Sequence, residues 1–150
     1  MKKLLILLAC LSISSTTLAY SNEDLAKVQA GGNCVGGDLS GADLSGLALS
    51  DRNFEGTKFI QARLVGTNFN NSNLNDTVFD HALMNSATFR SADITGASFK
   101  YASGTGADFT NADLSASNFY RAQLRGAKFL NANLQHIEGQ IGRASCRERV

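Results

Sequence analysis

The chain has 150 residues, of which 14 are Lys or Arg and 13 are Asp or Glu, together with three Cys and two His. Between residues 20 and 140, nine basic residues stand against 12 acidic ones, which gives a net charge of −3. This near balance excludes a surface as densely negative as that of DNA, which carries one charge per about 1.7 Å of its axis. The length is that of a single domain.

Residues 1–19 have the pattern of a secretory signal peptide. Two lysines begin the segment, an apolar run covers residues 4–11, and a small-x-small cleavage sequence ends at Ala19. The run is shorter than the ~20 apolar residues that a spanning helix needs. We therefore expect cleavage after Ala19, export to the periplasm or the medium, and no transmembrane segment in the mature chain. Lipid attachment at Cys10 is the less favoured alternative, because only six apolar residues precede it.

Residues 20–33 are predicted to form a short capping helix and a linker. Ser21 and Asp24 have the spacing of a helix-capping box, in which each end of the motif bonds the other. Leu25 and Val28 share one face of this helix. A repeat domain needs a cap at its open end, because unpaired strand edges otherwise associate. We expect Leu25 and Val28 to cover that end of the domain that follows.

Residues 34–139 are predicted to form one solenoid, because a fixed short repeat is typical of that architecture. From residue 39 to residue 134 every fifth residue is apolar, except Gly104, and all nine Phe lie in this column. Cys34 continues the column by one step and is interpreted as a small inward-facing residue, with pairing between molecules as the alternative. The column is Leu39, Leu44, Leu49, Phe54, Phe59, Leu64, Phe69, Leu74, Phe79, Met84, Phe89, Ile94, Phe99, Gly104, Phe109, Leu114, Phe119, Leu124, Phe129, Leu134.

A period of five fits neither a helix nor a flat strand. On a helix of 3.6 residues per turn the column would move around the cylinder, and in a strand an odd repeat changes face at each step. A chain that turns a corner once per five residues keeps the column inside. The residue two before each column member is mostly small, and the residues after it are rich in Gly, Asn, Asp and Ser, which suit turns.

The alternation of Phe and Leu along the column predicts the number of sides. A three-sided coil would stack Phe on Leu, whereas a four-sided coil stacks like on like. Strand spacing of about 4.8 Å then brings the Phe rings into stacking range. We expect an all-β rod of about five square coils, on the order of 24 Å long. The two predicted Phe ladders are Phe59, Phe79, Phe99 and Phe119, and Phe69, Phe89, Phe109 and Phe129.

Triplets such as Ala42-Asp43-Leu44, Ala107-Asp108-Phe109 and Ala112-Asp113-Leu114 resemble the pentapeptide-repeat family. The resemblance covers about two thirds of the chain and implies a right-handed quadrilateral β-helix. It implies no single function, because the family hosts many roles. Secreted members carry a second Cys three residues after the first, where this chain has Gly37, so we expect no local disulfide or metal pair.

Three positions break the repeat, and the first is Leu47, which stands where a small residue is expected. Arg52 stands where a small residue is expected, so either its coil is wider or Arg52 turns outward and pairs with Asp51 or Glu55. Gly104 is predicted to leave a hole in the column that Met84 partly fills. A ligand pocket in this hole is disfavoured, because one missing side chain leaves only a small void.

The outward positions offer two candidate surfaces. Ile60, Val65, Val78 and Leu83 are apolar and are predicted to lie near two adjoining sides of the second and third coils, as a candidate interaction patch. The last coils carry three cations near two tyrosines, a mixture that can suit nucleic acid or an anionic polymer. Acidic residues dilute this second group, so a solvated face is favoured. Its members are Arg121, Arg125, Lys128, Tyr101 and Tyr120.

Residues 140–150 break every pattern, and the last ten resemble the in-frame translation of a sequencing adapter. We interpret them as non-native and expect the natural chain to continue beyond Gln140. Cys146 leaves the cysteine count with this tail, and Cys10 leaves with the signal peptide. Cys34 is then the one Cys of the mature chain.

The sequence predicts no enzyme, metal or cofactor. Catalysis needs polar groups that converge in a concavity. His81 and His136 are 55 residues apart, which is not a multiple of twenty, so a four-sided coil places them at different corners. No small-molecule substrate is indicated either.

We expect a non-catalytic exported scaffold or binding module that presents a rigid surface to a protein or an envelope polymer. The alternative is a DNA mimic that inhibits or protects a type II topoisomerase, as the family resemblance allows. Cations along the rod and the export signal count against it, and nucleic acid is disfavoured as a partner. A homodimer through the coil ends is a further alternative.

Overall fold

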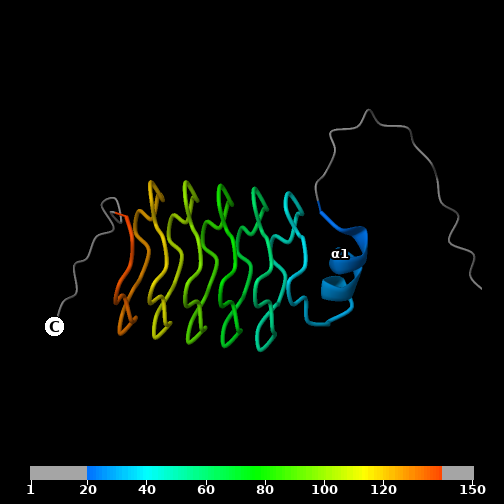
Figure 1. Ribbon diagram of the computed structural model, residues 1–150, viewed down its shortest axis with the longest axis horizontal. Coiled ribbons are helices and arrows are strands. Elements are labelled where there is room, and N and C mark those ends of the chain that lie inside the picture. The colour runs from blue at the N-terminus through cyan, green and yellow to red at the C-terminus, as the bar shows by residue number, and fades with distance from the viewer. Residues whose placement is uncertain (1–19, 140–150) are drawn as a thin grey trace, which may run out of the picture.

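The computed structural model describes residues 20–139, and the predicted signal peptide and non-native tail lie outside the described residues. Figure 1 shows a rod of stacked coils with one helix, α1, at the N-terminal end. Helix α1 spans Asn22–Gln29. The coils are joined by isolated parallel β-bridges, one on each side of each coil.

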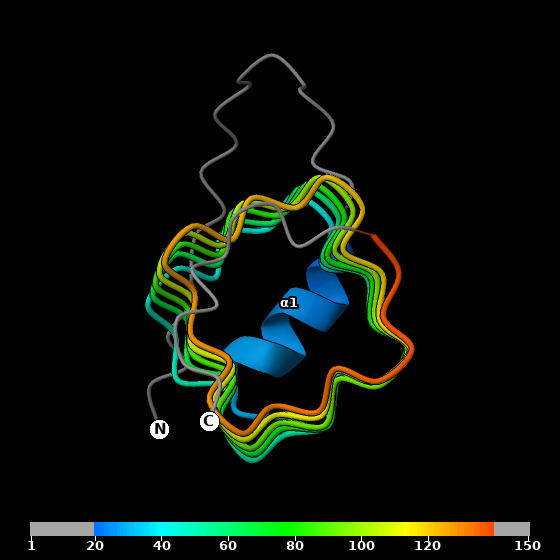
Figure 2. The ribbon, with the colours of Figure 1, turned by 90° about the vertical axis from the view of Figure 1, so that its left-hand side faces the viewer.

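The bridges give the register directly. Each bridged residue pairs in parallel with the residue twenty positions later, as in the ladder Asp38, Lys58, Val78, Ser98, Asn118 and Glu138. Three further ladders begin at Asp43, Ala48 and Asn53, so each twenty-residue coil has four sides. Figure 2, which looks along the rod, shows the four-sided outline. The predicted four-sided coil is confirmed.

Each turn contains one residue in the left-handed conformation. From Gly36 to His136, every fifth residue has a φ between 55° and 76°. This is the second turn position, where a type II turn requires a positive φ. Thirteen of these residues are not Gly, and the conformation costs such residues stability unless they are Asn or Asp. The composition of the sequence predicted turns here but not this single repeated conformation.

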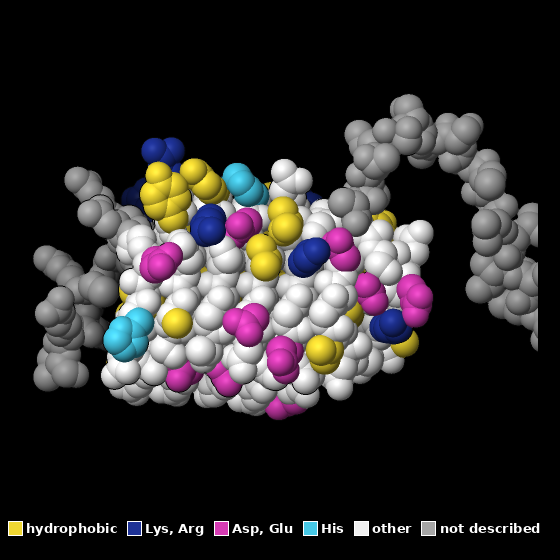
Figure 3. Space-filling model, in the orientation of Figure 1, with side chains coloured by type: hydrophobic (Ala, Val, Ile, Leu, Met, Phe, Trp, Pro, Cys, Tyr) yellow, Lys and Arg dark blue, Asp and Glu magenta, His cyan; other side chains and the backbone are white. Residues whose placement is uncertain are grey.

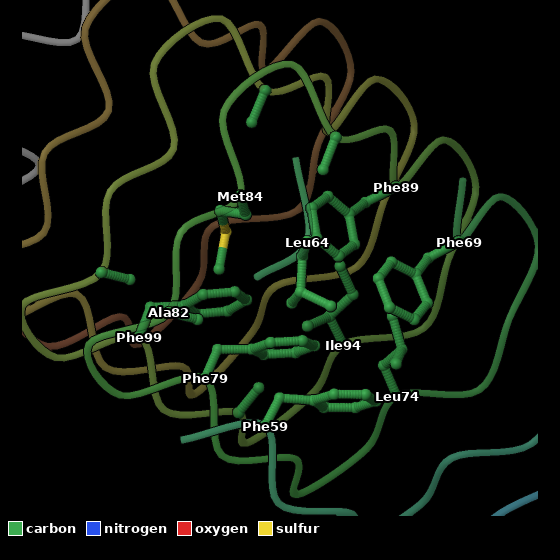
Figure 4. Packing of buried hydrophobic residues seen from close by; sticks show 14 of the residues in the cluster. Phe59, Leu64, Phe69, Leu74, Phe79, Ala82, Met84, Phe89, Ile94 and Phe99 are labelled. Atoms are coloured by element: carbon green, nitrogen blue, oxygen red, sulfur yellow. The ribbon is translucent and has the colours of Figure 1, made fainter. Parts of the chain in front are cut away.

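The two Phe ladders form the centre of the core. In one ladder the ring centroids of Phe59 and Phe79 are 4.9 Å apart, with planes 3° from parallel. The other ladder stacks Phe69 on Phe89 at 5.3 Å. Between the ladders the rings meet edge to face, as Phe69 and Phe79 do at 6.2 Å and 77°. Figure 4 shows both ladders with the aliphatic side chains that fill the rest of the coil.

Helix α1 lies across the N-terminal opening of the rod (Figure 2). Val28 is buried, and Leu25 is partly buried against the core. The Oγ atom of Ser21 accepts a hydrogen bond of 3.2 Å from the Asp24 N–H. The predicted reciprocal bond is wrong: the Asp24 carboxylate accepts from the Asp38 N–H at 3.0 Å, and the Ser21 N–H donates to the Asp38 carbonyl at 2.8 Å. These bonds attach the helix to the first coil.

Two of the three irregular positions differ from expectation. Arg52 pairs with neither Asp51 nor Glu55; its guanidinium donates to the carbonyl oxygens of Val28 at 2.8 Å and Ala48 at 3.0 Å. One of these carbonyl groups belongs to the last turn of α1 and the other to the first coil, so the cation is satisfied where the helix meets the rod.

Gly104 leaves no open hole. A Cβ atom at Gly104 would lie 2.8 Å from Cδ2 of Leu124 and 3.2 Å from Cγ of Met84. These side chains come from the next and the preceding coil and occupy the space themselves. The expectation that Met84 fills part of the gap was therefore incomplete, because Leu124 fills it as well.

Candidate interaction surface

The described residues contain no cluster of metal ligands, and their Cys residue is buried. Between residues 20 and 139 there is no group of three or more His, Cys, Asp or Glu side chains that could hold a metal ion. Cys34 is buried, and burial raises the pKa of its thiol, which keeps it protonated and unreactive.

No helix among residues 20–139 has both the length and the apolar character needed to cross a bilayer.

The structure divides the predicted apolar patch. Val78 and Leu83 flank one turn of the third coil, and Ile60 belongs to the same turn one coil earlier. Val65 lies at the next turn of the second coil. Val65 and Leu83 are 38% and 39% exposed, whereas Ile60 and Val78 are half-buried. Three of the four residues therefore share one corner of the rod.

The same corner carries an aromatic and cationic cluster, which we call the aromatic corner: His81, Tyr101, Tyr120 and Arg121. The His81 and Tyr101 rings are stacked, with centroids 5.0 Å apart and planes 6° from parallel. Tyr120 meets Tyr101 edge to face at 5.7 Å. The Arg121 guanidinium carbon lies 5.9 Å from the Tyr101 centroid and 5.4 Å from that of Tyr120. These distances allow cation–π attraction.

Figure 3 shows this cluster as a raised row of apolar, His and basic side chains along one edge of the rod. Tyr101 and Tyr120 are 43% and 46% exposed. The sequence analysis grouped the tyrosines with Arg125 and Lys128 and missed His81. The signal was present in the sequence, because residues 81, 101 and 121 are twenty apart and so occupy one position in successive coils. Arg125 lies at the next turn. Lys128 lies on another side of the rod, where its main chain forms a β-bridge with that of Asp108.

Three basic side chains of the described rod have partners, whereas five form no side-chain ion pair or hydrogen bond within residues 20–139: Lys58, Lys100, Arg121, Arg125 and Lys128. Arg90 Nη2 lies 2.7 Å from the Asp108 carboxylate, and Arg63 Nε lies 3.4 Å from that of Asp43. Arg52 is held by carbonyl oxygens. Within residues 20–139, Arg121 forms neither an ion pair nor a hydrogen bond. The cation that the tyrosines hold in place is thus free to meet an anion from outside.

Asp108 shows how the paired charges are held. Burial by itself would raise the pKa of its carboxyl group. Hydrogen bonds from Thr110 and the ion pair with Arg90 outweigh this effect and hold the pKa of Asp108 below its ordinary value. Asp108 therefore remains charged and structurally engaged, which excludes it as a proton donor near neutral pH.

The fold resembles those of solved pentapeptide-repeat proteins. A pentapeptide-repeat protein, Rfr23, from the cyanobacterium Cyanothece 51142 is 17% identical with a TM-score of 0.75, over 79% of this chain and 94% of that one. A pentapeptide-repeat protein from the Arabidopsis thaliana thylakoid lumen is 26% identical with a TM-score of 0.66, over 71% and 79%. QnrB1, a plasmid-mediated fluoroquinolone resistance protein, is 24% identical over 71% and 72%, but its TM-score of 0.47 supports no argument.

No curated protein sequence matches the chain. The family model described as pentapeptide repeats matches in eight copies, over residues 38–76, 62–100 and 105–137. The matched segments cover most of the four-sided coil, with its twenty-residue register and its apolar column. The chain belongs to the pentapeptide-repeat family, whose members fold as right-handed quadrilateral β-helices.

Proposed function

We propose that this protein is a non-catalytic exported scaffold that binds a macromolecular partner through one corner of its rod. The observation that carries the proposal is the exposed cluster of His81, Tyr101, Tyr120 and Arg121, with apolar side chains beside it. Exposed apolar and aromatic side chains gathered in one place are typical of interaction sites. Pentapeptide-repeat proteins are generally structural or binding proteins, which agrees with this function.

The architecture favours recognition by a preformed surface. Every coil is bonded to its neighbours through the main chain, as the Phe59 N–H is to the Val78 carbonyl at 2.7 Å. The side chains of the corner therefore stand on a backbone that is already ordered. Binding to such a surface loses little conformational entropy, so few contacts suffice for useful affinity.

Export is the second part of the proposal. It is supported by the signal-peptide pattern of residues 1–19, with mature residues 20–33 as cap and linker and 34–139 as solenoid. The similar Arabidopsis thaliana protein is one from the thylakoid lumen. In the proposed compartment the partner is a protein rather than a nucleic acid.

DNA mimicry of a type II topoisomerase is the competing function, and the charges of the described rod disfavour it. A mimic needs a continuous row of negative charge. Here the ladder that begins at Asp38 continues with Lys58 and Val78, and the ladder that begins at Asp43 continues with Arg63 and Leu83. Neither row presents an uninterrupted anionic stripe.

The proposed function is tested by locating the protein in its native cells and measuring the mass of its N-terminal peptide. The proposal expects a mature chain that begins at Tyr20 in the exported fraction, and a saturable protein partner when the full-length secreted form is used as bait. A cytosolic protein that retains Met1 would contradict export and would revive the topoisomerase alternative. Sedimentation of the purified protein distinguishes a foreign partner from a homodimer.

A further inference from the structure

One corner of the rod differs from the other three at its left-handed turn position. Along this corner the position is occupied by Gly41, Gln61, His81, Tyr101 and Arg121, each with a positive φ. The other corners fill it with Gly, Asn, Asp, Ser or Ala, with His136 as the exception near the end of the described chain.

The large residues at this corner are held in an unfavourable backbone conformation. Tyr101 has a φ of 59° and Arg121 a φ of 55°, a region that bulky L-residues rarely occupy. Gly or Asn would fold more easily at both positions. Residues that cost stability where a small residue would serve are typical of functional sites, so the cluster is better explained by what it binds than by folding.

The geometry prepares the Arg121 guanidinium for an anion. The tyrosine rings lie 5.9 and 5.4 Å from the guanidinium carbon and so limit the positions that it can adopt. Arg121 has no acidic partner within residues 20–139. The acidic residues of the same corner and side are already engaged: Asp80 accepts from the Ser98 hydroxyl at 2.6 Å, and Glu138 accepts from the Asn118 amide at 2.7 Å.

Apolar side chains continue the surface toward the N-terminal coils. Leu83 is 39% exposed, and the half-buried Val78 lies on the other side of the His81 turn. Ile60 belongs to the same corner one coil earlier. The corner thus runs from an aliphatic part, through the stacked His81 and Tyr101 rings, to the Arg121 guanidinium, and Lys100 in the Tyr101 turn is a second cation without an ion pair within residues 20–139.

We propose that this corner binds an acidic segment of a protein partner, with a carboxylate on Arg121 and apolar side chains against Tyr101 and Leu83. This inference rests on the proposed binding function and names its site and ligand chemistry. Tyr and Arg are the residues that most often dominate protein–protein binding energy. A polyanion such as a sulfated sugar or a nucleic acid would instead require a row of cations. At this corner the cations are Lys100 and Arg121 alone, and the Asp80 carboxylate one coil earlier ends the row.

The test begins with a selection of random twelve-residue displayed peptides on the full chain, followed by titration of synthetic versions that lack Tyr and Trp. Tyrosine fluorescence reports binding directly, because the chain has three Tyr and no Trp and two of the three lie in the cluster. We expect the selected peptides to combine Asp or Glu with apolar residues. We expect Arg121→Asn and Tyr101→Asn each to weaken binding by at least about tenfold.

The variants are chosen so that a loss of binding cannot be mistaken for a loss of folding. Asn tolerates the left-handed conformation, so both variants should melt at or above the temperature of the parent chain. His136→Asn makes the same exchange at another corner, and Arg125→Asn removes a cation from the next turn of the same coil. Both controls should bind like the parent.

Each other outcome overturns the inference. Peptides whose affinity is unchanged by Arg121→Asn and Tyr101→Asn would place the binding site elsewhere and would overturn this corner as the site, while a binding function on another surface of the rod would still stand. If no peptide is selected, and trigalacturonate or a twelve-nucleotide single strand changes the tyrosine fluorescence instead, the ligand is a polymer. If none of these probes binds and the native protein has no partner, the corner inference and the binding function both fail.

Discussion

The Arg52 guanidinium donates a hydrogen bond of 2.8 Å to the main-chain carbonyl oxygen of Val28, and so ties the end of helix α1 to the rod. The same guanidinium donates to the Ala48 carbonyl oxygen at 3.0 Å. One side chain therefore joins the cap to the first coil. The Val28 carbonyl oxygen also accepts from the Gly31 N–H at 3.1 Å, so Arg52 is its second donor at the end of the helix.

Replacement of this contact should loosen the cap while the coils stay folded. We expect Arg52→Met, which keeps much of the side-chain volume, to lower the protection of the α1 amides against hydrogen exchange by about 1.5–3 kcal/mol, the net value of hydrogen bonds to a charged group. Amides in the central coils, such as that of Phe99, should exchange as in the parent. An equal loss of protection in the cap and the central coils would show that Arg52 supports the whole fold instead.

The stability lost when a Phe of the core ladders is truncated should depend on its position along the rod. Phe99 is fully buried between Phe79 at 5.0 Å and Phe119 at 4.9 Å. We expect Phe99→Ala to lower the free energy of unfolding by about 3–5 kcal/mol, through lost burial and the cavity it leaves. Phe129 is only half-buried and stacks on one described neighbour. We therefore expect Phe129→Ala to lower the free energy of unfolding by less than half as much as Phe99→Ala does. Urea denaturation measures both values, and equal costs would contradict this account of the ladder.

The Arg90–Asp108 pair predicts a dependence of stability on pH. The pKa of Asp108 is lower in the folded protein than the ordinary carboxyl value near 3.9 that applies when the chain is unfolded. Its contribution is therefore complete above about pH 4 and is lost as the pH falls through the lower folded pKa. The stability difference between the parent and Asp108→Asn should be largest at pH 6 and should shrink toward pH 2. A difference that stays constant over this range in urea titrations would exclude an ionised Asp108 as its source.

At the left-handed turn position, adding and removing a Cβ atom should change the stability of the protein in opposite directions. Gly126 has a φ of 70°, and no atom lies within 4 Å of where a Cβ would stand, so Gly126→Ala tests the backbone alone. We expect it to cost about 1–2 kcal/mol. Ala116 occupies the same turn position with a φ of 57°, so Ala116→Gly should be neutral or stabilising by up to about 1 kcal/mol. Thermal unfolding of the two variants checks the signs, and a shift in the same direction for both would refute the argument.

The coil could be predicted from the sequence because one physical constraint repeats along it. A large apolar residue every fifth position, with Phe and Leu in alternation, fits a four-sided coil and places Phe59 over Phe79. The residues that stack or form a β-bridge from one coil to the next are twenty apart, so these contacts follow from the spacing. The capping helix could also be predicted, because Ser21 is a typical residue at the start of a helix and its hydroxyl accepts from the Asp24 N–H.

Contacts that depend on how the cap docks on the rod could not be predicted. Arg52 bonds Val28, which is 24 residues away and belongs to a helix whose docking no repeat specifies. From the sequence, Arg52 was therefore expected to form an ion pair with Asp51 or Glu55. The space beside Gly104 is filled by the side chains of Leu124 and Met84. The spacing of residues along the chain does not predict which conformations these two side chains adopt.

The aromatic corner lies between these cases. The twenty-residue spacing of His81, Tyr101 and Arg121 places them in one row, but their significance depends on conformation and pairing. The positive φ values and the absence of an acidic partner for Arg121 within residues 20–139 are visible only in three dimensions. A row of residues in the sequence was therefore interpreted as a solvated face.

The most direct test of the binding function is photo-crosslinking in the native cells. The full chain carries p-benzoyl-phenylalanine in place of Tyr101 or, as a control, in place of Asn131, which occupies the left-handed position of another corner. We predict one defined adduct from position 101, joined through an acidic segment of an exported protein that mass spectrometry identifies, and no adduct from position 131. The same adducts from both positions, or none from position 101, would contradict a binding module that acts through this corner.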